Sequence, residues 1–344
     1  MKILFYIIFI ILIIYLNKTL DWTIQLHPES INYDINNIDT YLNYIIDLKL
    51  TSVKIDFNWK DIEPTQGIFD ITKKNFFKNF LIKAKNKNLK TVVILAGLPE
   101  WASNLYKNDY QNFLINWKKY VQIVINDLGF SEFYQIGNEP NNMIPGVNQL
   151  YGPNSWEVIK EAGLIIKNLS PLSKRIVNID ASWPPIIKTN LWENFANELC
   201  IKSKQAIDIM AVDFYPGVWT LTTYNDYDPL NKMISKIKNV NDPCYGLKTG
   251  LMETGFTTVN FPGLFWTELG QWTFYNSALP KLKQISQDNM EVEILGLYEL
   301  IDDGAPNPPV HELNADLISN AELYFGLLRK DFSKKLAYNK VKYR

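Results

Sequence analysis

Apolar residues along the chain fall into two kinds of segment. Short apolar runs, which have the length and composition of buried strands, begin near Trp22, Ser52, Thr91, Glu132, Arg175, Ile209, Thr249 and Glu293. Neighbouring runs start roughly 30 to 45 residues apart, which is about the length of one strand and helix repeat. The segments between them place apolar residues every three to four positions, as an amphipathic helix does. This alternation is typical of repeated βαβ units and a parallel sheet.

The number of predicted strands indicates the architecture. Eight strands, seven helical regions between them and a helical tail fit a closed barrel better than an open sheet, because an open sheet that wide is uncommon. Loop-forming residues such as Pro99, Pro140 and Pro216 also follow the predicted strands, where a barrel needs loops. We therefore predict an α/β fold with a single (β/α)8 barrel, the TIM barrel, over residues 21–344.

Residues 1–20 are predicted to be a targeting segment. Lys2 is followed by an uninterrupted apolar run from Ile3 to Leu16, which has the length of a signal-peptide core and is short for a membrane-spanning helix. We therefore expect a secreted protein, or one that resides in the secretory pathway. No clear small-x-small cleavage site follows the run, so the alternative is an uncleaved signal anchor that holds the protein on a membrane by residues 3–16.

Composition narrows the possible partners. Hydrophobic residues make up 47% of the chain, which is enough for a large core, and the 35 basic and 36 acidic side chains nearly cancel. No stretch combines clustered Lys and Arg with aromatic residues, so we discount nucleic acid as a partner. With only two histidines and two cysteines, the chain has no ligand cluster of the usual metal-binding kind, and we expect neither a metal nor another cofactor. We expect a monomer.

The two cysteines are predicted to pair. Cys200 and Cys244 each lie a few residues before a predicted strand, at residues 207–214 and 249–252. Consecutive barrel strands bring these entrances side by side at the bottom of the barrel, so one structural disulfide is expected in an exported protein. The alternative is two buried thiols.

Candidate chemistry lies where the strands end, because the reactive groups of a (β/α)8 barrel stand at the carboxyl ends of its strands. Those ends are rich in polar and aromatic residues, namely His27, Trp59, Glu100, Trp101, Asn138, Glu139, Asp180, Trp183, Asp213, Tyr215, Trp219, Glu253, Tyr298, Glu299, Asp302 and Asp303. Glu139 follows the fourth strand and Glu253 ends the seventh. Two such glutamates can form the acid and the nucleophile of a sugar-cleaving site. Taken singly, each could also be an ordinary loop carboxylate.

Several motifs in order resemble those of a known family. They are GNEPN at residues 137–141, METG at 252–255, WKDIEP at 59–64 with Gly67 and Phe69-Asp70, and the tail segments FGLL at 325–328 and KLAY at 335–338. Together they resemble the retaining glycoside hydrolases of clan A, of the family 5 and family 39 type, over almost the whole chain from Trp22 to Tyr338. The resemblance implies a (β/α)8 barrel in which the tail segments form the final helix.

The resemblance also implies residue roles. Glu139 would be the acid/base, which protonates the glycosidic oxygen and later deprotonates water. Glu253 would be the nucleophile that forms a covalent glycosyl-enzyme. Asn138 would hydrogen-bond the sugar 2-hydroxyl, and Tyr215 would hold the carboxylate of the nucleophile in place. A retaining site needs its two carboxyls about 5 to 5.5 Å apart, one protonated and one ionised.

Further residues at the strand ends are expected to contact substrate. Trp101, Trp183, Trp219 and Tyr298 either stack on sugar faces or merely roof the barrel, and His27 is a further candidate for substrate binding. Three positions depart from the family pattern. Lys54 stands where many members carry an arginine near the nucleophile, Asp213 where many carry a histidine, and Tyr298 where many carry a tryptophan. A lysine cannot reproduce the planar two-pronged contact of an arginine.

The sequence thus predicts a retaining O-glycosidase that hydrolyses β-linked polysaccharide or oligosaccharide with Glu139 and Glu253. Two alternatives remain open at this point. One is a catalytically silent barrel that binds carbohydrate, for which the substitutions at Lys54, Asp213 and Tyr298 argue. The other is a transglycosylase, which uses the same two residues with a sugar as acceptor. The sequence leaves open which sugar is cleaved and whether attack is endo or exo.

Overall fold

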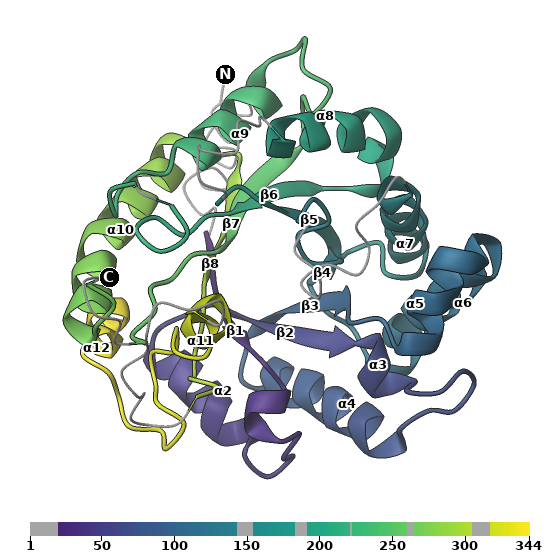
Figure 1. Cartoon of the computed structure of the whole chain (residues 1–344), viewed down its shortest axis with the longest axis horizontal. Coiled ribbons are helices and arrows are strands. Elements are labelled where there is room, and N and C mark those ends of the chain that lie inside the picture. The colour runs from purple at the N-terminus through teal and green to yellow at the C-terminus, as the bar shows by residue number, and fades with distance from the viewer. Residues whose placement is uncertain (1–19, 143–153, 183–190, 221, 260–264, 305–316) are drawn as a thin grey trace, which may run out of the picture.

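Eight parallel strands close into a barrel in which each strand pairs with its neighbours in chain order. This is the predicted single (β/α)8 barrel (Figure 1). The computed structural model describes residues 20–142, 154–182, 191–220, 222–259, 265–304 and 317–344. The strands are β1 Asp21–Leu26, β2 Ser52–Asn58, β3 Lys90–Ala96, β4 Phe133–Ile136, β5 Lys174–Asp180, β6 Ile209–Asp213, β7 Lys248–Glu253 and β8 Val292–Leu297.

Most of the helices surround the barrel on its outer side, as Figure 1 shows, whereas α11 projects over the ring of strands in that view. They are α2 Ile38–Asp47, α3 Trp59–Ile62, α4 Ile71–Asn86, α5 Glu100–Asn108, α6 Tyr110–Ile123, α7 Ser155–Leu169, α8 Leu191–Ser203, α9 Asp228–Lys238, α10 Glu268–Asp288, α11 Leu317–Glu322 and α12 Ala337–Lys342. Local sequence fixes several of their starts. Asp70 accepts a hydrogen bond from the Lys73 backbone at 2.9 Å, and Thr267 caps α10 in the same way through Gly270. Such caps satisfy backbone donors that the first helical turn leaves free.

The barrel interior changes from apolar to polar along its axis. A separate buried apolar cluster fills the part of the interior farther from the carboxyl ends of the strands. It consists of Val92, Phe133, Ile176, Ile209, Ala211, Met252 and Ile294. Because strand side chains alternate between two faces, residues two positions further along a strand point the same way. Ile176 is therefore followed by Asn178 and Asp180 on β5, and Ala211 is followed by Asp213 on β6. The upper layer of the interior is thus a polar floor at the carboxyl ends of the strands.

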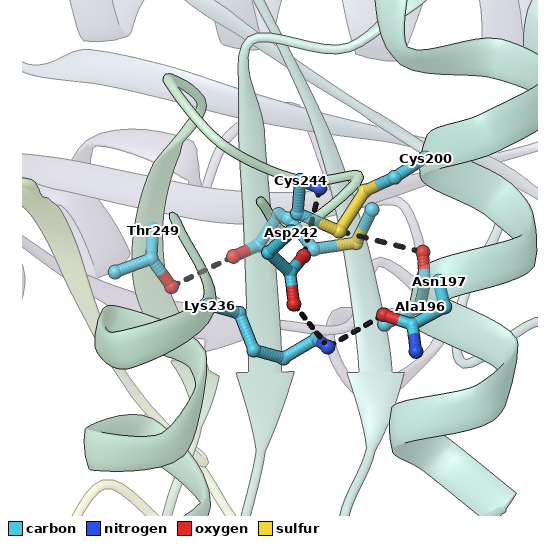
Figure 2. The surroundings of a disulfide bond; sticks show 8 residues. Ala196, Asn197, Cys200, Lys236, Asp242, Cys244 and Thr249 are labelled. Carbon is cyan, nitrogen blue, oxygen red and sulfur yellow. Dashed lines mark hydrogen bonds and ion pairs between the residues drawn. A yellow bond between two sulfur atoms is a disulfide. The ribbon is translucent and has the colours of Figure 1, made fainter. Parts of the chain in front are cut away.

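A disulfide joins α8 to the loop between α9 and β7, as predicted for Cys200 and Cys244. The two Cα atoms lie 5.2 Å apart, and the Lys236 ammonium beside the bridge contacts Asn197 and Asp242 (Figure 2). The bridged residues are 44 positions apart. Closing a loop of that length stabilises a fold by about 4 kcal/mol in the chain-entropy treatment.

The tail departs in part from the expected final helix. Residues 325–328 are not helical, and of residues 335–338 only Ala337 and Tyr338 belong to a helix, α12 Ala337–Lys342. Backbone hydrogen bonds hold residues 325–328 beside the loop after β8: Leu327 donates to Glu299 at 3.1 Å, and Leu328 donates to Leu300 at 2.9 Å. These tertiary contacts take the place of the helix that the resemblance implied. As a result, the tail passes beside the loop after β8 and brings side chains to the barrel mouth.

The predicted leader, residues 1–20, lies outside the described part of the chain except for Leu20. Of the helices that are described, none combines the length and the apolar composition needed to cross a membrane.

Candidate active site

Four carboxyl groups stand at the carboxyl ends of four consecutive strands. Glu139 follows β4, while Asp180, Asp213 and Glu253 are the last residues of β5, β6 and β7. The strand register pairs Asp180 with Asp213 and Asp213 with Glu253. Carboxylate oxygens of Glu139, Asp213 and Glu253 all lie within 4.8 Å of one another. The fold therefore brings the two predicted glutamates together, at a separation close to that of a retaining site.

Glu253 is held by two donors that approach different oxygens. The Lys54 ammonium lies 2.5 Å from Oε1, and the Tyr215 hydroxyl donates to Oε2 at 2.6 Å. Lys54 is fully buried, so it contacts the carboxylate rather than the open mouth of the barrel. Burial, and next the charge of Glu253, raise the pKa of Tyr215 far above its usual range, so the phenol keeps its proton. Cation and hydroxyl together stabilise the ionised form of Glu253.

Glu139 has the opposite environment. Burial raises its pKa well above the usual range, and the neighbouring carboxyl groups of Asp180, Asp213 and Glu253 act in the same direction. The Asn142 amide donates to Oε2 at 3.0 Å, which opposes the rise. These surroundings favour the protonated form of Glu139. Its backbone has a φ of 45°, in the left-handed region that few side chains adopt, and its N–H donates to Asn178 Oδ1 at 3.2 Å.

Asn178 connects the residues of this floor. Its Nδ2 group donates to Asn138 Oδ1 at 2.8 Å and also to Asp213 Oδ2. Asn138 Oδ1 accepts a second bond from Gln135 at 3.0 Å. Both acceptor positions of that oxygen are thereby occupied. The half-buried Asn138 side chain is left with its NH2 group for a ligand, as donation to a hydroxyl requires.

A histidinium stands on the β1 and β8 side of the mouth. His27 Nδ1 lies 2.6 Å from Asp56, while Nε2 lies 3.2 Å from the Tyr298 hydroxyl and 3.3 Å from Glu299. Burial lowers the pKa of His27, but Asp56, through its charge and hydrogen bond, and Glu299 outweigh burial and raise the pKa to about 10. His27 is 22% exposed. It therefore offers a charged, partly accessible ring beside Tyr298.

The tail contributes Glu322, which the sequence analysis did not single out. Burial, and next the negative charge of Glu253, raise the pKa of Glu322 to about 7, while its hydrogen bond with Tyr298 acts in the opposite direction. No strand end marks this residue in the sequence, because it lies on α11, far along the chain. Asn178 was missed as well, although a polar residue inside the apolar run at residues 175–180 is a visible signal.

Aromatic rings line the mouth on the side of Glu253. The Tyr298 ring centroid lies 5.9 Å from that of Tyr215 and 5.4 Å from that of Phe325. Trp219, which is partly exposed, continues this wall at 6.0 Å from Phe325 and 6.2 Å from Trp266. The structure therefore places Trp219 and Tyr298 in one aromatic wall, to which Phe325 adds an edge that the sequence analysis assigned to a helix.

The other two predicted tryptophans have different outcomes. Trp101 donates to the Glu63 carbonyl at 3.2 Å and packs edge-on against Trp59, with centroids 5.1 Å apart. Its described contacts are thus with the loop after β2, and they support the roofing alternative. Trp183 lies outside the described residues.

Three of the strand-end carboxyls also have the spacing of a metal site. Within the described ranges, Glu139, Asp213 and Glu253 are the one such group. A divalent cation there would have to share Glu253 with the Lys54 ammonium, which already lies 2.5 Å away. The negative charge of this group of three carboxyls is therefore better balanced by the Lys54 ammonium and by bound protons than by a resident metal ion.

Comparison with solved structures finds the same fold in glycoside hydrolases. A β-glycosidase, BGL167, shares 14% identity with a TM-score of 0.66, over 95% of this chain and 96% of that chain. The GH5_18 protein from Streptomyces cattleya, in complex with Manb1-4GlcNAc, shares 13% identity with a TM-score of 0.67, over 94% and 80% of the two chains. A family 39 glycoside hydrolase from Bacteroides cellulosilyticus WH2 shares 16% identity with a TM-score of 0.63, over 95% of this chain but 63% of that chain. No protein-family model and no curated protein sequence matches the chain.

Proposed function

We propose that this protein is a retaining glycosidase that hydrolyses β-linked sugars, with Glu139 as acid/base and Glu253 as nucleophile. One observation carries the proposal. Two glutamates at the ends of β4 and β7 have oxygens within 4.8 Å of each other in opposite environments: burial and neighbouring charge raise the pKa of Glu139, whereas a lysine and a tyrosine hold the carboxylate of Glu253. That pairing of a proton donor with an anion is what double displacement requires.

In the first step, Glu253 attacks the anomeric carbon while Glu139 gives its proton to the departing glycosidic oxygen. The bond between the anomeric carbon and the leaving oxygen breaks, and a glycosyl ester of Glu253 forms. In the second step, the Glu139 carboxylate takes a proton from water, whose oxygen attacks the same carbon. The ester bond breaks, both residues return to their first state, and the two inversions leave the sugar with its original configuration.

The electrostatics of the pair suit this change of role. While Glu253 is ionised, its negative charge helps to raise the pKa of Glu139. Formation of the neutral glycosyl ester removes that charge, which lowers the pKa of Glu139. The same carboxyl is therefore a stable acid in the first step and can act as a base in the second.

The surrounding residues and the structural neighbours support a carbohydrate substrate. Asn138 offers an NH2 group from the floor, and His27 offers a charged ring beside the aromatic wall. Similar structures include an exo-β-1,4-mannosidase from an Opitutaceae bacterium and a GH1 β-glucosidase from Exiguobacterium antarcticum B7. These neighbours act on different β-linked sugars, so the proposal covers the linkage class and not one sugar.

The direct test is chemical rescue on a panel of activated β-glycosides. Glu139→Gln should lower hydrolysis by at least about 100-fold. Glu253→Gly should be inactive in buffer and should recover turnover with azide, giving the α-glycosyl azide. Glu198→Gln, on the exposed face of α8, is the matched control for the substitution itself. Full activity in either site variant, or a β-azide product, would refute the assignment.

A further inference from the structure

Asp213 is a buried carboxyl that the two-glutamate mechanism does not use. It is fully buried at the end of β6, with oxygens within 4.8 Å of those of both Glu139 and Glu253. Its Oδ2 accepts one hydrogen bond from Asn178, while Oδ1 has no hydrogen-bond partner among the described residues. A buried acceptor of this kind needs a physical explanation, because leaving it without a partner costs free energy.

The neighbouring carboxyls show what a supported anion looks like here. Glu253 accepts from the Lys54 ammonium and the Tyr215 hydroxyl. Asp180 accepts from the Ser182 backbone N–H at 2.8 Å and from the Asn142 amide at 3.2 Å. In contrast, one neutral amide is the described support of Asp213. Burying an ionised carboxylate with so little support costs more free energy than burying a neutral carboxylic acid, so a group in this position takes up a proton.

We propose that Asp213 is a positioning residue that carries a proton across the working pH range of the enzyme. The four strand-end carboxyls then alternate along the barrel mouth: Glu139 and Asp213 are protonated, and Asp180 and Glu253 are ionised. The protonation state of Asp213 stands on its own geometry, whereas its catalytic consequence rests on the proposed glycosidase function. Burial, and next the nearby charge of Glu253, also raise the pKa of Asp213 well above its usual range, and they outweigh the Lys54 ammonium and the Asn178 hydrogen bond, which lower it.

The proton on Asp213 serves both catalytic glutamates. Lys54 is the cation that reaches this floor, and its ammonium contacts Glu253 and the Met252 carbonyl. A second anion at position 213 would compete for that charge and would favour protonation of the nucleophile. Asp213 also accepts from Asn178, the amide that binds both the Asn138 side chain and the Glu139 backbone N–H. Asp213 therefore orients the acid/base strand end through Asn178.

The protonation state can be read without measuring activity. In infrared difference spectra of the full chain at neutral pH, wild type minus Asp213→Asn should show the loss of one carboxylic-acid C=O stretch. Wild type minus Asp180→Asn should show the loss of a carboxylate band instead, and serves as the matched control. The proposal is overturned if Asp213→Asn removes a carboxylate band. Should that variant fail to fold, 13C-aspartate NMR of the wild type provides the test. At least one aspartate must show the carboxyl chemical shift of a protonated acid at neutral pH, and the absence of such a signal overturns the proposal.

The positioning role has a kinetic test on any β-glycoside that is turned over. Asp213→Ala removes one of the two acceptors of the Asn178 amide and should lower kcat by about 10-fold or more, since a misplaced acid/base slows the chemical step. Asp213→Asn should restore most of that loss and leave the alkaline limb of the kcat/KM profile in place. If Asp213 were ionised, Asn would remove a negative charge near Glu139, lower its pKa and move that limb to lower pH. A shifted alkaline limb, or no rescue by Asp213→Asn, contradicts the positioning role.

If no glycoside is turned over, the proposed function fails, while the infrared measurement still shows whether Asp213 is protonated.

Discussion

Asn138 can only donate to a bound sugar, because Gln135 and Asn178 already occupy its carbonyl oxygen. A donor aimed at the sugar 2-hydroxyl acts most strongly in the transition state, where charge develops at the neighbouring anomeric carbon. This feature of one side chain makes a prediction about the substrate as well as about the enzyme.

We predict that Asn138→Ala lowers kcat/KM on a β-glycoside by about 100-fold, as loss of a transition-state hydrogen bond does. On the matching 2-deoxy glycoside, the variant and the wild type should differ little, since the hydroxyl that Asn138 binds is absent. Steady-state kinetics with both substrates measures the coupling. An equal loss on the two substrates would show that Asn138 acts on the structure of the floor and not on the 2-hydroxyl.

His27 predicts a pH-dependent stability. Its pKa is 6.5 in an ordinary setting and about 10 in the folded protein. The folded state therefore binds the proton more tightly than the unfolded state, so this stabilisation is fully present below about pH 6.5 and is lost as pH rises through about 10. Denaturant unfolding of the wild type and His27→Gln should show a difference that shrinks across this window. A difference that grows toward alkaline pH would contradict the charged assignment.

The positions of the site residues were predictable from the sequence where a motif carries them. Glu139 and Tyr215 follow strands whose order is readable and Glu253 ends one, so their meeting at the mouth could be anticipated. Asn178 and Glu322 could not be assigned in the same way. Asn178 depends on partners from β4 and β6, and Glu322 reaches the mouth because the tail lies beside the loop after β8. Such contacts arise from proximity in space, which one sequence does not display.

At the scale of elements, the strands were more predictable than the tail. Each barrel strand contains a short apolar run, and the observed strand starts lie within one residue of the predicted starts, which is inside the usual uncertainty of element boundaries. The resemblance implied a helix at residues 325–328, but they are not helical, and Leu328 forms isolated bridges with Ile301 and Lys334. Gln271 fixes this segment as well, since its amide donates to the carbonyls of Phe325 and Gly326 at 3.1 Å.

The disulfide supports a prediction about elements. It ties α8 to the loop that enters β7, across a separation of 44 residues. Reduction of the wild type should lower the free energy of unfolding by about 4 kcal/mol. Chemical denaturation with and without reductant measures the change, and the double variant Cys200→Ala with Cys244→Ala should not respond to reductant. If reduction left the unfolding midpoint of the wild type unchanged, the bridge would not stabilise this fold.

At the scale of the whole molecule, the barrel combines an apolar plug with a polar floor of alternating acids and anions. The near balance of 35 basic and 36 acidic residues hides this arrangement, because the functional charges are concentrated at one end of the barrel. We propose, from the apolar run at residues 3–16, that this barrel works outside the cytosol, either released or anchored. Fractionation of the expressing cells tests that proposal.

In the proposed mechanism, Glu253 forms a covalent bond to the sugar. The fluorine of an activated 2-deoxy-2-fluoro β-glycoside slows both chemical steps. Because the leaving group is good, formation of the glycosyl-enzyme is still faster than its hydrolysis, so that the intermediate accumulates. Mass spectrometry of the intact protein and of its proteolytic peptides is the most direct measurement. We expect one added fluoroglycosyl group, on the peptide that contains Glu253, and none in Glu253→Gln. Turnover of the parent β-glycoside to an α-configured sugar without any adduct, or an adduct on another residue, would contradict this mechanism.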